Sequence, residues 1–454
     1  MKLLVQALYD SSTNNYPRYF PNPLNLIKFA NDNDVLLDFN LEAFKKNKEQ
    51  KEEIIARAAK IINESLLIYK EIIINCGEYA PDGAFYEYFE SLLDKIKIPV
   101  SLIGSYPAVF PERVKEKYGK RVKLKEFDFD VHDVVLNTDL LKLYPEVDGL
   151  KKVNVKISNG CLRKCNYCPV HLIHKGKYTY FDIEQSLNLI KYYYKNGIRF
   201  FNFIDDNIGA DSKFFDFLRR LKQENLKDAK FQVQEGFEVL TFKNQEICQL
   251  LKDINFVDIK IGVENINDEF RKSLNKTFFS SKDIELAMQN IRESNLDVKM
   301  FLLISERQTA DEIMENVKFI LNNNISARIN IIRAYEKSKY FSEIKPNRIT
   351  ESELKEIKSL ATALIWLNKE KKINVFSDTA IQKLKLSMKL EISESNVEIV
   401  IKGNCYFGFQ TSYFVKAIKY LLEKKRKYLL KTLEVERNKI IFTKIKNEIT
   451  QKVA

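Results

Sequence analysis

The sequence predicts an α/β protein, and two observations support that fold class. As far as about residue 335, short apolar runs with strand character alternate with longer segments whose apolar residues recur at helical spacing. Strands that alternate with helices form βαβ units, which build parallel sheets. The length of 454 residues allows two or three domains with real cores, at about 100–200 residues per domain.

The first region, residues 1–150, is predicted to be a Rossmann-like domain. Two of its strands end in glycine, at Gly77 and Gly104, and ligands bind at the carboxyl ends of the strands in such sheets. These turns therefore mark the edge at which a ligand is expected. The predicted elements are strands at Lys2–Leu8, Asp34–Phe39, Ile72–Gly77 and Pro99–Gly104 and helices at Leu41–Tyr69 and Phe85–Lys95.

The second region, residues 151–335, repeats the alternation more regularly. Its six strands and five helices fit either an open sheet or a partial (β/α)6 barrel, and periodicity alone does not choose. The strands are expected at Lys152–Ser158, Phe200–Ile204, Phe231–Gln234, Val257–Ile261, Val298–Ile304 and Ala327–Ile332. The helices are expected at Ile183–Tyr194, Lys213–Gln223, Gln245–Lys252, Ser281–Ser294 and Ala310–Leu321.

The third region, residues 336–454, is rich in lysine and mostly helical by pattern. A strand is expected at Val397–Ile401, and no functional motif is readable there.

Composition excludes several classes of protein. A hydrophobic share of 45% with 30% charged residues is typical of a globular protein and not of a disordered chain. No stretch approaches the ~18 consecutive apolar residues of a membrane span, and the apolar run within Met1–Tyr9 is too short for a secretory signal. Six cysteines in so long a chain do not make a disulfide scaffold, so a reducing cytoplasm is the expected setting.

The net charge of +12 leaves a nucleic-acid partner open without establishing one. Basic runs such as Lys45–Lys48 and Lys424–Lys427 are usually solvated helix faces.

Three of the cysteines lie together in the loop after the first strand of the second region. Cys161, Cys165 and Cys168 have the spacing C-x3-C-x2-C, and three thiolates on one loop can hold three irons of a [4Fe–4S] cluster. The fourth iron is then open to bind a small molecule. A structural zinc site that recruits His171 or His174 is an alternative, since zinc accepts three cysteines and one histidine.

This cysteine motif resembles the signature of the radical S-adenosylmethionine (SAM) superfamily, and the resemblance implies a partial barrel for residues 151–335. In the family, the open iron binds the amino and carboxylate groups of SAM, and reductive cleavage of SAM gives a 5′-deoxyadenosyl radical that abstracts hydrogen from the substrate. By position, Cys161, Cys165 and Cys168 would be the cluster ligands. Tyr167 occupies the aromatic position that lies against the adenine in the family, although loop packing also explains a tyrosine there.

Two later segments extend the resemblance. Asp205-Asp206-Asn207 looks like the D-D-N segment of one radical SAM branch, and its carboxylates could accept hydrogen bonds from the SAM ammonium or ribose. Gly262-Val263-Glu264 resembles the G-x-E segment at which polar groups meet SAM. Helix capping or a surface turn would equally explain Asp205 and Asp206, and a surface ion pair would explain Glu264.

One segment departs from the family pattern. Ser305-Glu306-Arg307-Gln308-Thr309 follows the fifth strand, where the family often has a turn rich in glycine and proline. Cys76, Cys248 and Cys405 are isolated in the sequence, so a second cluster is not expected.

In that branch a cobalamin-binding domain precedes the barrel, and the first region looks like one at Pro21–Leu24 and Gly104–Pro111. The D-x-H-x-x-G motif that supplies a histidine to cobalt elsewhere is missing, since Val135 stands where glycine would follow Asp130 and His132. The branch often lacks that motif, so cobalamin stays an expected cofactor beside the cluster and SAM.

The resemblance implies an enzyme that modifies an unactivated carbon, with cobalamin-dependent methyl transfer as one outcome. A flavodoxin or ferredoxin is the electron donor that it implies. The alternatives are radical SAM modification of RNA or a peptide without cobalamin, and a structural zinc-binding module without catalysis. The sequence names neither the substrate nor the oligomeric state.

Overall fold

The computed structural model describes residues 1–7, 26, 34–39, 48–77, 83–125, 152–233, 235–332, 338–342, 346–355, 357–358, 361–362, 365, 388–392, 397–401 and 440–441. The chain divides into two compact units. The first comprises Met1–Gly262, Asp268–Val298 and Arg333–Ile344, and the second comprises Val263–Asn267, Lys299–Ile332 and Lys345–Ala454. Among the described residues, no helix is long and apolar enough to cross a membrane.

The amino-terminal region forms a five-stranded parallel sheet with the strand order β2-β1-β3-β4-β5. This is the flavodoxin-like order of a doubly wound fold, in which ligands bind where the order reverses, between β1 and β3. All four predicted strands are present, and the three-residue β5 was too short to predict. The strands are β1 (Lys2–Gln6), β2 (Val35–Asp38), β3 (Glu71–Asn75), β4 (Val100–Ile103) and β5 (Val122–Leu124).

Helices follow the strands of this sheet, and their apolar faces complete its core. Ile55, Ala58 and Ile62 of α3 and Phe89 and Leu92 of α4 are all buried in that core. Residues 41–47 of the first predicted helix lie outside the described residues. The helices are α3 (Lys48–Glu64), α4 (Gly83–Lys95), α5 (Ser105–Val109) and α6 (Pro111–Tyr118), with 3₁₀ turns η1 (Ser65–Leu67) and η2 (Gly119–Arg121).

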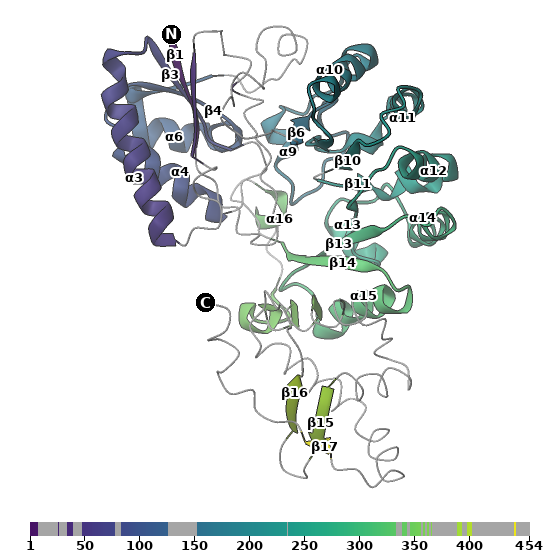
Figure 1. Cartoon of the computed structure of the whole chain (residues 1–454). Helices are drawn as coiled ribbons and strands as arrows, with labels where there is room; N and C mark the ends of the chain where they lie inside the picture. The colour runs from purple at the N-terminus through teal and green to yellow at the C-terminus, as the bar shows by residue number, and fades with distance from the viewer. Residues whose placement is uncertain are drawn as a thin grey trace, which may run out of the picture. The chain divides into compact units, whose positions relative to one another are not determined.

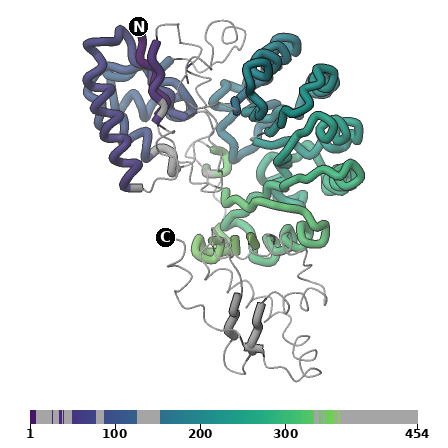
Figure 2. Tube along the Cα trace, in the orientation of Figure 1, coloured from purple at the N-terminus to yellow at the C-terminus, as the bar shows by residue number. Residues whose placement is uncertain are grey.

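The second region contains the six predicted strands and five predicted helices in alternation (Figures 1 and 2). β6, β9 and β10 form a parallel sheet in the order β10-β9-β6, β11 pairs in parallel with β12, and β13 pairs in parallel with β14. The strands are β6 (Lys152–Val155), β9 (Phe200–Phe203), β10 (Lys230–Val233), β11 (Phe237–Glu238), β12 (Ile259–Glu264), β13 (Val298–Ile304) and β14 (Ser326–Ile331). The helices are α10 (Ile183–Lys195), α11 (Lys213–Gln223), α12 (Gln245–Asp253), α14 (Ser281–Glu293) and α15 (Ala310–Asn322).

Side-chain caps explain where several of these helices begin. Ser280 with Asp283 starts α14, and Thr309 with Glu312 starts α15, each as a reciprocal capping box. The segment at residues 305–309, where the family often has a glycine- and proline-rich turn, is therefore a turn that ends in a helix cap.

Phenylalanine rings fill the space beneath β9 and β10. Phe203 is fully buried, and its ring centroid lies 6.0 Å from that of Phe256, 6.3 Å from that of Phe231 and 5.8 Å from that of Phe217. Phe201 stacks on Phe231 at 5.3 Å. These rings fix the position of β9, and the D-D-N segment follows directly after that strand.

Short elements escaped prediction, because three to six residues carry no readable period. They include the strands β7 (Ser158–Gly160) and β8 (Tyr178–Tyr180) and the helices α9 (Val170–Ile173), α13 (Asp268–Ser273) and α16 (Lys339–Ser342), with 3₁₀ turns η3 (Ile208–Ala210) and η4 (Val239–Lys243). The predicted strand before the G-x-E segment was placed too early: β12 begins at Ile259 and runs through Glu264.

In the third region, the predicted strand at Val397–Ile401 is present as β16. It pairs antiparallel with β15 (Met388–Ile392), which also pairs with β17 (Ile440–Ile441). Two segments that were compared above with cobalamin-binding domains lie outside the described residues. They are Pro21–Leu24 and Asp130–His132.

Replacing Phe203 by alanine should lower the free energy of unfolding by about 3–5 kcal/mol, because it opens a cavity between packed rings. Urea unfolding of the protein and of the variant measures the change. Tyr192→Ala is the control, since Tyr192 is 42% exposed and its loss should cost far less. Equal losses in the two variants would contradict this account of the core.

Candidate functional site

The three cysteines lie on a loop that a small antiparallel hairpin closes. β7 pairs with β8, with Ser158 opposite Tyr180 and Gly160 opposite Tyr178. The two ends of the loop formed by residues 161–177 are therefore adjacent. Gly160 has a φ of 76°, and a Cβ there would lie 2.1 Å from the carbonyl oxygen of Lys177. Only glycine fits this position, since any side chain would force the hairpin apart.

All three cysteines are free thiols, with Cys165 buried and Cys161 and Cys168 half-buried. The Sγ of Cys161 accepts hydrogen bonds from the backbone N–H of Arg163 at 3.3 Å and from Nδ2 of Asn207 at 3.5 Å. Burial raises the pKa of the Cys161 thiol, and these two donors act in the opposite direction. Burial also raises the pKa of the Cys168 thiol.

Asp205 holds the turn between β6 and β7. Its Oδ1 accepts hydrogen bonds from the backbone N–H of Ile157 at 3.1 Å and of Ser158 at 2.5 Å, and from the Ser158 hydroxyl at 2.6 Å. The side chain is fully buried, and Oδ2 has no hydrogen-bond partner within the part of the chain that the structure describes. Burial raises the pKa of this carboxyl to about 6, even though the Ser158 hydrogen bond and the nearby Lys156 lower it.

Asp206 holds the other side of the same hairpin. Its Oδ2 accepts a hydrogen bond from the backbone N–H of Gly160 at 3.2 Å and lies 3.0 Å from Nε2 of His174 and 3.9 Å from Nζ of Lys156. Burial alone would raise the pKa of Asp206, but Lys156 and His174 keep it below its ordinary value. His174, considered above as a zinc ligand, thus contacts a carboxylate.

A buried glutamate that the sequence did not single out joins the cysteine loop to the strand ends. Glu238, at the end of β11, is 5% exposed. Its carboxylate accepts from Nε and Nη2 of Arg163, at 3.0 and 2.8 Å, and from Nδ2 of Asn207 at 3.0 Å. The Arg163 guanidinium also lies 4.1 Å from the centroid of the Phe278 ring. A carboxylate after a two-residue strand carries no sequence signal that would have identified it.

The segment after α13 supports the middle of the loop. Asn166 donates from its backbone N–H to the Leu274 carbonyl oxygen at 2.9 Å and from Nδ2 to the Ser273 carbonyl oxygen at 3.1 Å. Asn275 donates a hydrogen bond from Nδ2 to the Lys164 carbonyl oxygen at 2.7 Å. Lys164, between the first and second cysteines, and Asn166, between the second and third, are therefore both held by hydrogen bonds to this segment.

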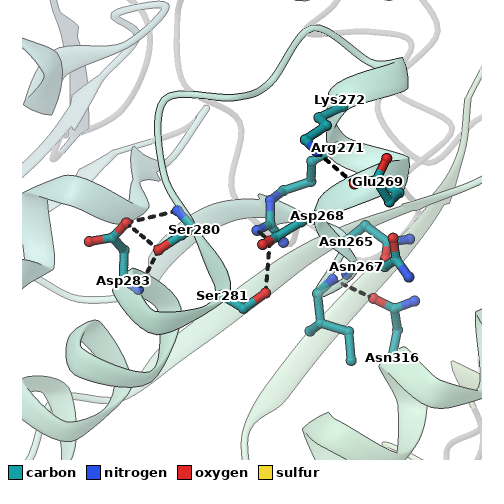
Figure 3. Close-up of polar contacts among 11 residues, drawn as sticks. Asn265, Asn267, Asp268, Glu269, Arg271, Lys272, Ser280, Ser281, Asp283 and Asn316 are labelled. Atoms are coloured by element: carbon teal, nitrogen blue, oxygen red, sulfur yellow. Dashed lines mark hydrogen bonds and ion pairs between the residues drawn. The ribbon is translucent and has the colours of Figure 1, made fainter.

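Figure 3 shows how α13 itself is held. The Asp268 carboxylate accepts from the buried Arg271 and, at 2.8 Å, from the Ser281 hydroxyl at the start of α14. The Arg271 guanidinium lies 4.8 Å from the centroid of the Phe279 ring. In the second compact unit, Asn316 Oδ1 accepts from the backbone N–H of Ile266 at 2.8 Å (Figure 3).

The remaining predicted site residues occupy separate positions. Tyr167 is half-buried on the cysteine loop, directly before Cys168. Glu264 belongs to the second compact unit, where it is the last residue of β12, 8% exposed and in the left-handed region with a φ of 63°. A glutamate in that conformation is unusual and marks a locally strained strand end.

Replacing Asp205 by asparagine should change how stability depends on pH. The pKa of Asp205 is raised from 3.8 to about 6 on folding, so the folded protein binds its proton more tightly and loses stability as the pH rises through this range. Asparagine keeps the Oδ1 acceptor and does not titrate. As the pH rises from about 5 to about 7.5, the free energy of unfolding of the variant should therefore increase by about 1–2 kcal/mol relative to that of the wild type.

Urea unfolding at the two pH values measures this gain. Asp253→Asn is the control, because the Lys222 hydrogen bond holds the pKa of Asp253 below its ordinary value and that carboxylate stays ionised throughout the range. A difference between Asp205→Asn and the wild type that does not vary with pH would show that Asp205 does not titrate there.

A known protein family covers part of this chain. Residues 155–320 match the family model described as the radical SAM superfamily. The bacteriochlorophyllide d C-12(1)-methyltransferase of Chlorobaculum tepidum is 20% identical over 216 residues, which are 46% of this chain and 45% of the relative. The ribosomal protein uS12 methylthiotransferase RimO of Pelodictyon phaeoclathratiforme is 27% identical over 184 residues, 36% of this chain and 40% of the relative. The chain thus spans less than half the length of these two relatives.

The structure is also similar to a solved one. The radical SAM methyltransferase TsrM from Kitasatospora setae, determined with cobalamin and a [4Fe–4S] cluster bound, superposes with a TM-score of 0.56 at 14% identity, covering 75% of this chain and 76% of that one. The likeness confirms the predicted fold class: a Rossmann-like domain followed by a partial barrel. Residues 155–320, with the cysteine loop after their first strand, are a radical SAM domain.

Proposed function

We propose that this chain is a radical SAM enzyme that modifies an unactivated carbon by cobalamin-dependent methyl transfer. The observation that carries the proposal is the loop of Cys161, Cys165 and Cys168, closed by the β7–β8 hairpin within the radical SAM domain. The three cysteines would hold the [4Fe–4S] cluster. When bound, the cluster would supply the electron that cleaves SAM, and cobalamin would carry the methyl group.

The donor set of the cysteine loop suits a cluster. In a cubane each thiolate binds a different iron, and three thiolates leave the fourth iron open. A single zinc ion would need a fourth ligand. His174, one of the two histidines considered for that role, already contacts the Asp206 carboxylate at 3.0 Å. This contact supports the catalytic hypothesis over the zinc-binding module.

The chain's own residues hold and shape this site. Asp205 and Asp206 fix the two ends of β7 and thus the start of the cysteine loop. We infer that Tyr167 packs against the adenine of SAM and that Glu264 contacts its polar groups, as the family resemblance implies. For Asp205 and Asp206, the hydrogen bonds favour a positioning role, although the unpartnered Oδ2 of Asp205 leaves one acceptor for a ligand.

The amino-terminal sheet offers a polar site at its switch point. Gln6 ends β1 and Asn75 ends β3, and Nδ2 of Asn75 donates to Oε1 of Gln6 at 2.9 Å. Both side chains and that of Ser105 are fully buried, and among the described residues Nε2 of Gln6 and Oγ of Ser105 have no hydrogen-bond partner. Buried polar atoms without partners are costly and indicate a missing partner. The amide-bearing side chains of cobalamin would supply suitable groups at this edge.

A second candidate function is radical SAM modification of a protein or RNA without cobalamin. The similarity to a ribosomal protein methylthiotransferase favours a protein substrate, and the net charge of +12 favours an anionic partner. Cobalt content separates the two functions. In both cases a flavodoxin or ferredoxin would donate the electron. None of the five described cysteines is in a disulfide, which suits a reducing, cytoplasmic setting.

Anaerobically purified protein should contain about four irons per chain and should cleave SAM when reduced. Cys165→Ala should abolish SAM cleavage and most of the iron, because one corner of the cluster loses its ligand. Cys248→Ala is the matched control, since Cys248 is also a buried free thiol but lies on α12. Cleavage by Cys165→Ala would refute the assignment, and so would purified protein that holds zinc alone.

Cobalamin should bind the amino-terminal sheet, and Gln6→Met and Ser105→Ala should each weaken binding about tenfold, the equivalent of one lost hydrogen bond. Equilibrium dialysis against hydroxocobalamin, read by visible absorbance, measures the affinity. Ser101→Ala is the control, because Ser101 lies on β4 and already bonds to Glu71. Wild-type protein that holds iron and binds no cobalamin would favour the second function.

A further inference from the structure

Four residues, including the first cysteine of the motif, form a closed hydrogen-bonded ring through their side chains and one backbone N–H. Asn207 Nδ2 donates to Cys161 Sγ at 3.5 Å and to Glu238 Oε2 at 3.0 Å. The Glu238 carboxylate accepts hydrogen bonds from Nε and Nη2 of Arg163. The backbone N–H of Arg163 donates to Cys161 Sγ at 3.3 Å, which closes the ring. We call Cys161, Arg163, Asn207 and Glu238 the Cys161 ring.

The ring leaves Asn207 little freedom to turn. Its side chain is buried at 8% exposure, and a single amide nitrogen serves both the sulfur and the Glu238 carboxylate. Since an amide nitrogen carries two hydrogens, the carboxylate holds one and directs the other toward the sulfur. Glu238 is in turn fixed by two parallel bonds from Arg163, a geometry that Arg and carboxylate groups favour.

Each member of the ring changes the electrostatic potential at the Cys161 sulfur. An N–H donor stabilises negative charge on a cluster thiolate and stabilises it more when the cluster is reduced, so the donor raises the reduction potential. The Glu238 carboxylate opposes reduction by its negative charge, and the Arg163 guanidinium offsets that charge. Because the groups are largely buried, solvent screens these effects little.

We propose that the Cys161 ring sets the reduction potential of the cluster, with Asn207 as the positioning residue that raises it and Glu238 as the carboxylate that orients Asn207 and lowers it. The proposal rests on the proposed function, because it requires the cluster on the three cysteines. It assigns a role to the asparagine of the D-D-N segment that differs from the roles of the two aspartates before it. Those aspartates bond to the hairpin, whereas Asn207 bonds to the sulfur.

The test is a redox titration of the iron-loaded protein, followed by the electron paramagnetic resonance signal of the reduced cluster. Asn207→Leu removes the side-chain donor and should shift the potential to more negative values. Glu238→Gln removes a negative charge while keeping an acceptor for Arg163, and should shift the potential to more positive values. Shifts of opposite sign are the expected result, since damage to the fold would not separate the two variants in this way.

Thr241→Val is the matched control. Thr241 donates to the Gly209 carbonyl oxygen at 3.2 Å in the turn that follows Asn207, so its loss disturbs the same turn without removing a donor to sulfur. It should leave the potential unchanged. If Asn207→Leu fails to retain iron, Asn207→Ala removes the donor without adding bulk, and Glu238→Gln gives an independent reading.

Unchanged potentials in iron-loaded Asn207 and Glu238 variants would overturn the inference and leave the proposed function intact. Shifts of the same sign in both variants would also overturn it. Wild-type protein without a cluster would refute the proposed function itself, and iron content measured in the same samples distinguishes these outcomes.

Discussion

Two adjacent carboxylates at the end of β9 determine where the cysteine loop begins. Asp205 binds the backbone before β7 and Asp206 binds the backbone at its end, so the β7 strand is fixed at both ends by one dipeptide. The position of that dipeptide depends on β9, which packed phenylalanine rings hold from below. The aromatic core and the cysteine loop are therefore connected through two acidic residues, of which Asp205 is buried and Asp206 is half-buried.

The alternation of strands and helices could be predicted from the sequence, because apolar periodicity over ten or more residues is a strong signal. The six predicted strands and five predicted helices of the second region are all present, with β12 displaced by a few residues. The loop with Cys161, Cys165 and Cys168 was equally predictable, since its spacing is specific. The hairpin that closes the loop was not, because each of its strands has three residues.

The supports of the site could not be predicted for a related reason. Glu238, Leu274 and Asn275 reach the cysteine loop from positions far away in the sequence, and their contacts depend on tertiary packing. The predicted contacts of Asp205 and Asp206 with a ligand compete with backbone hydrogen bonds that only the fold reveals. The strand order of the first sheet likewise follows from the pairing of β1 with both β2 and β3, which a sequence read in order does not show.

The closed hairpin has a consequence for cofactor assembly. A loop whose ends already meet has lost much of its closure entropy before any ligand arrives, so ordering it costs little when a ligand binds. The thiols are thus preorganised, in contrast to small zinc modules that fold only around their metal. Assembly of the proposed cluster would then be a docking event on an existing surface, governed by access to Cys161 and Cys168 more than by the folding of the chain.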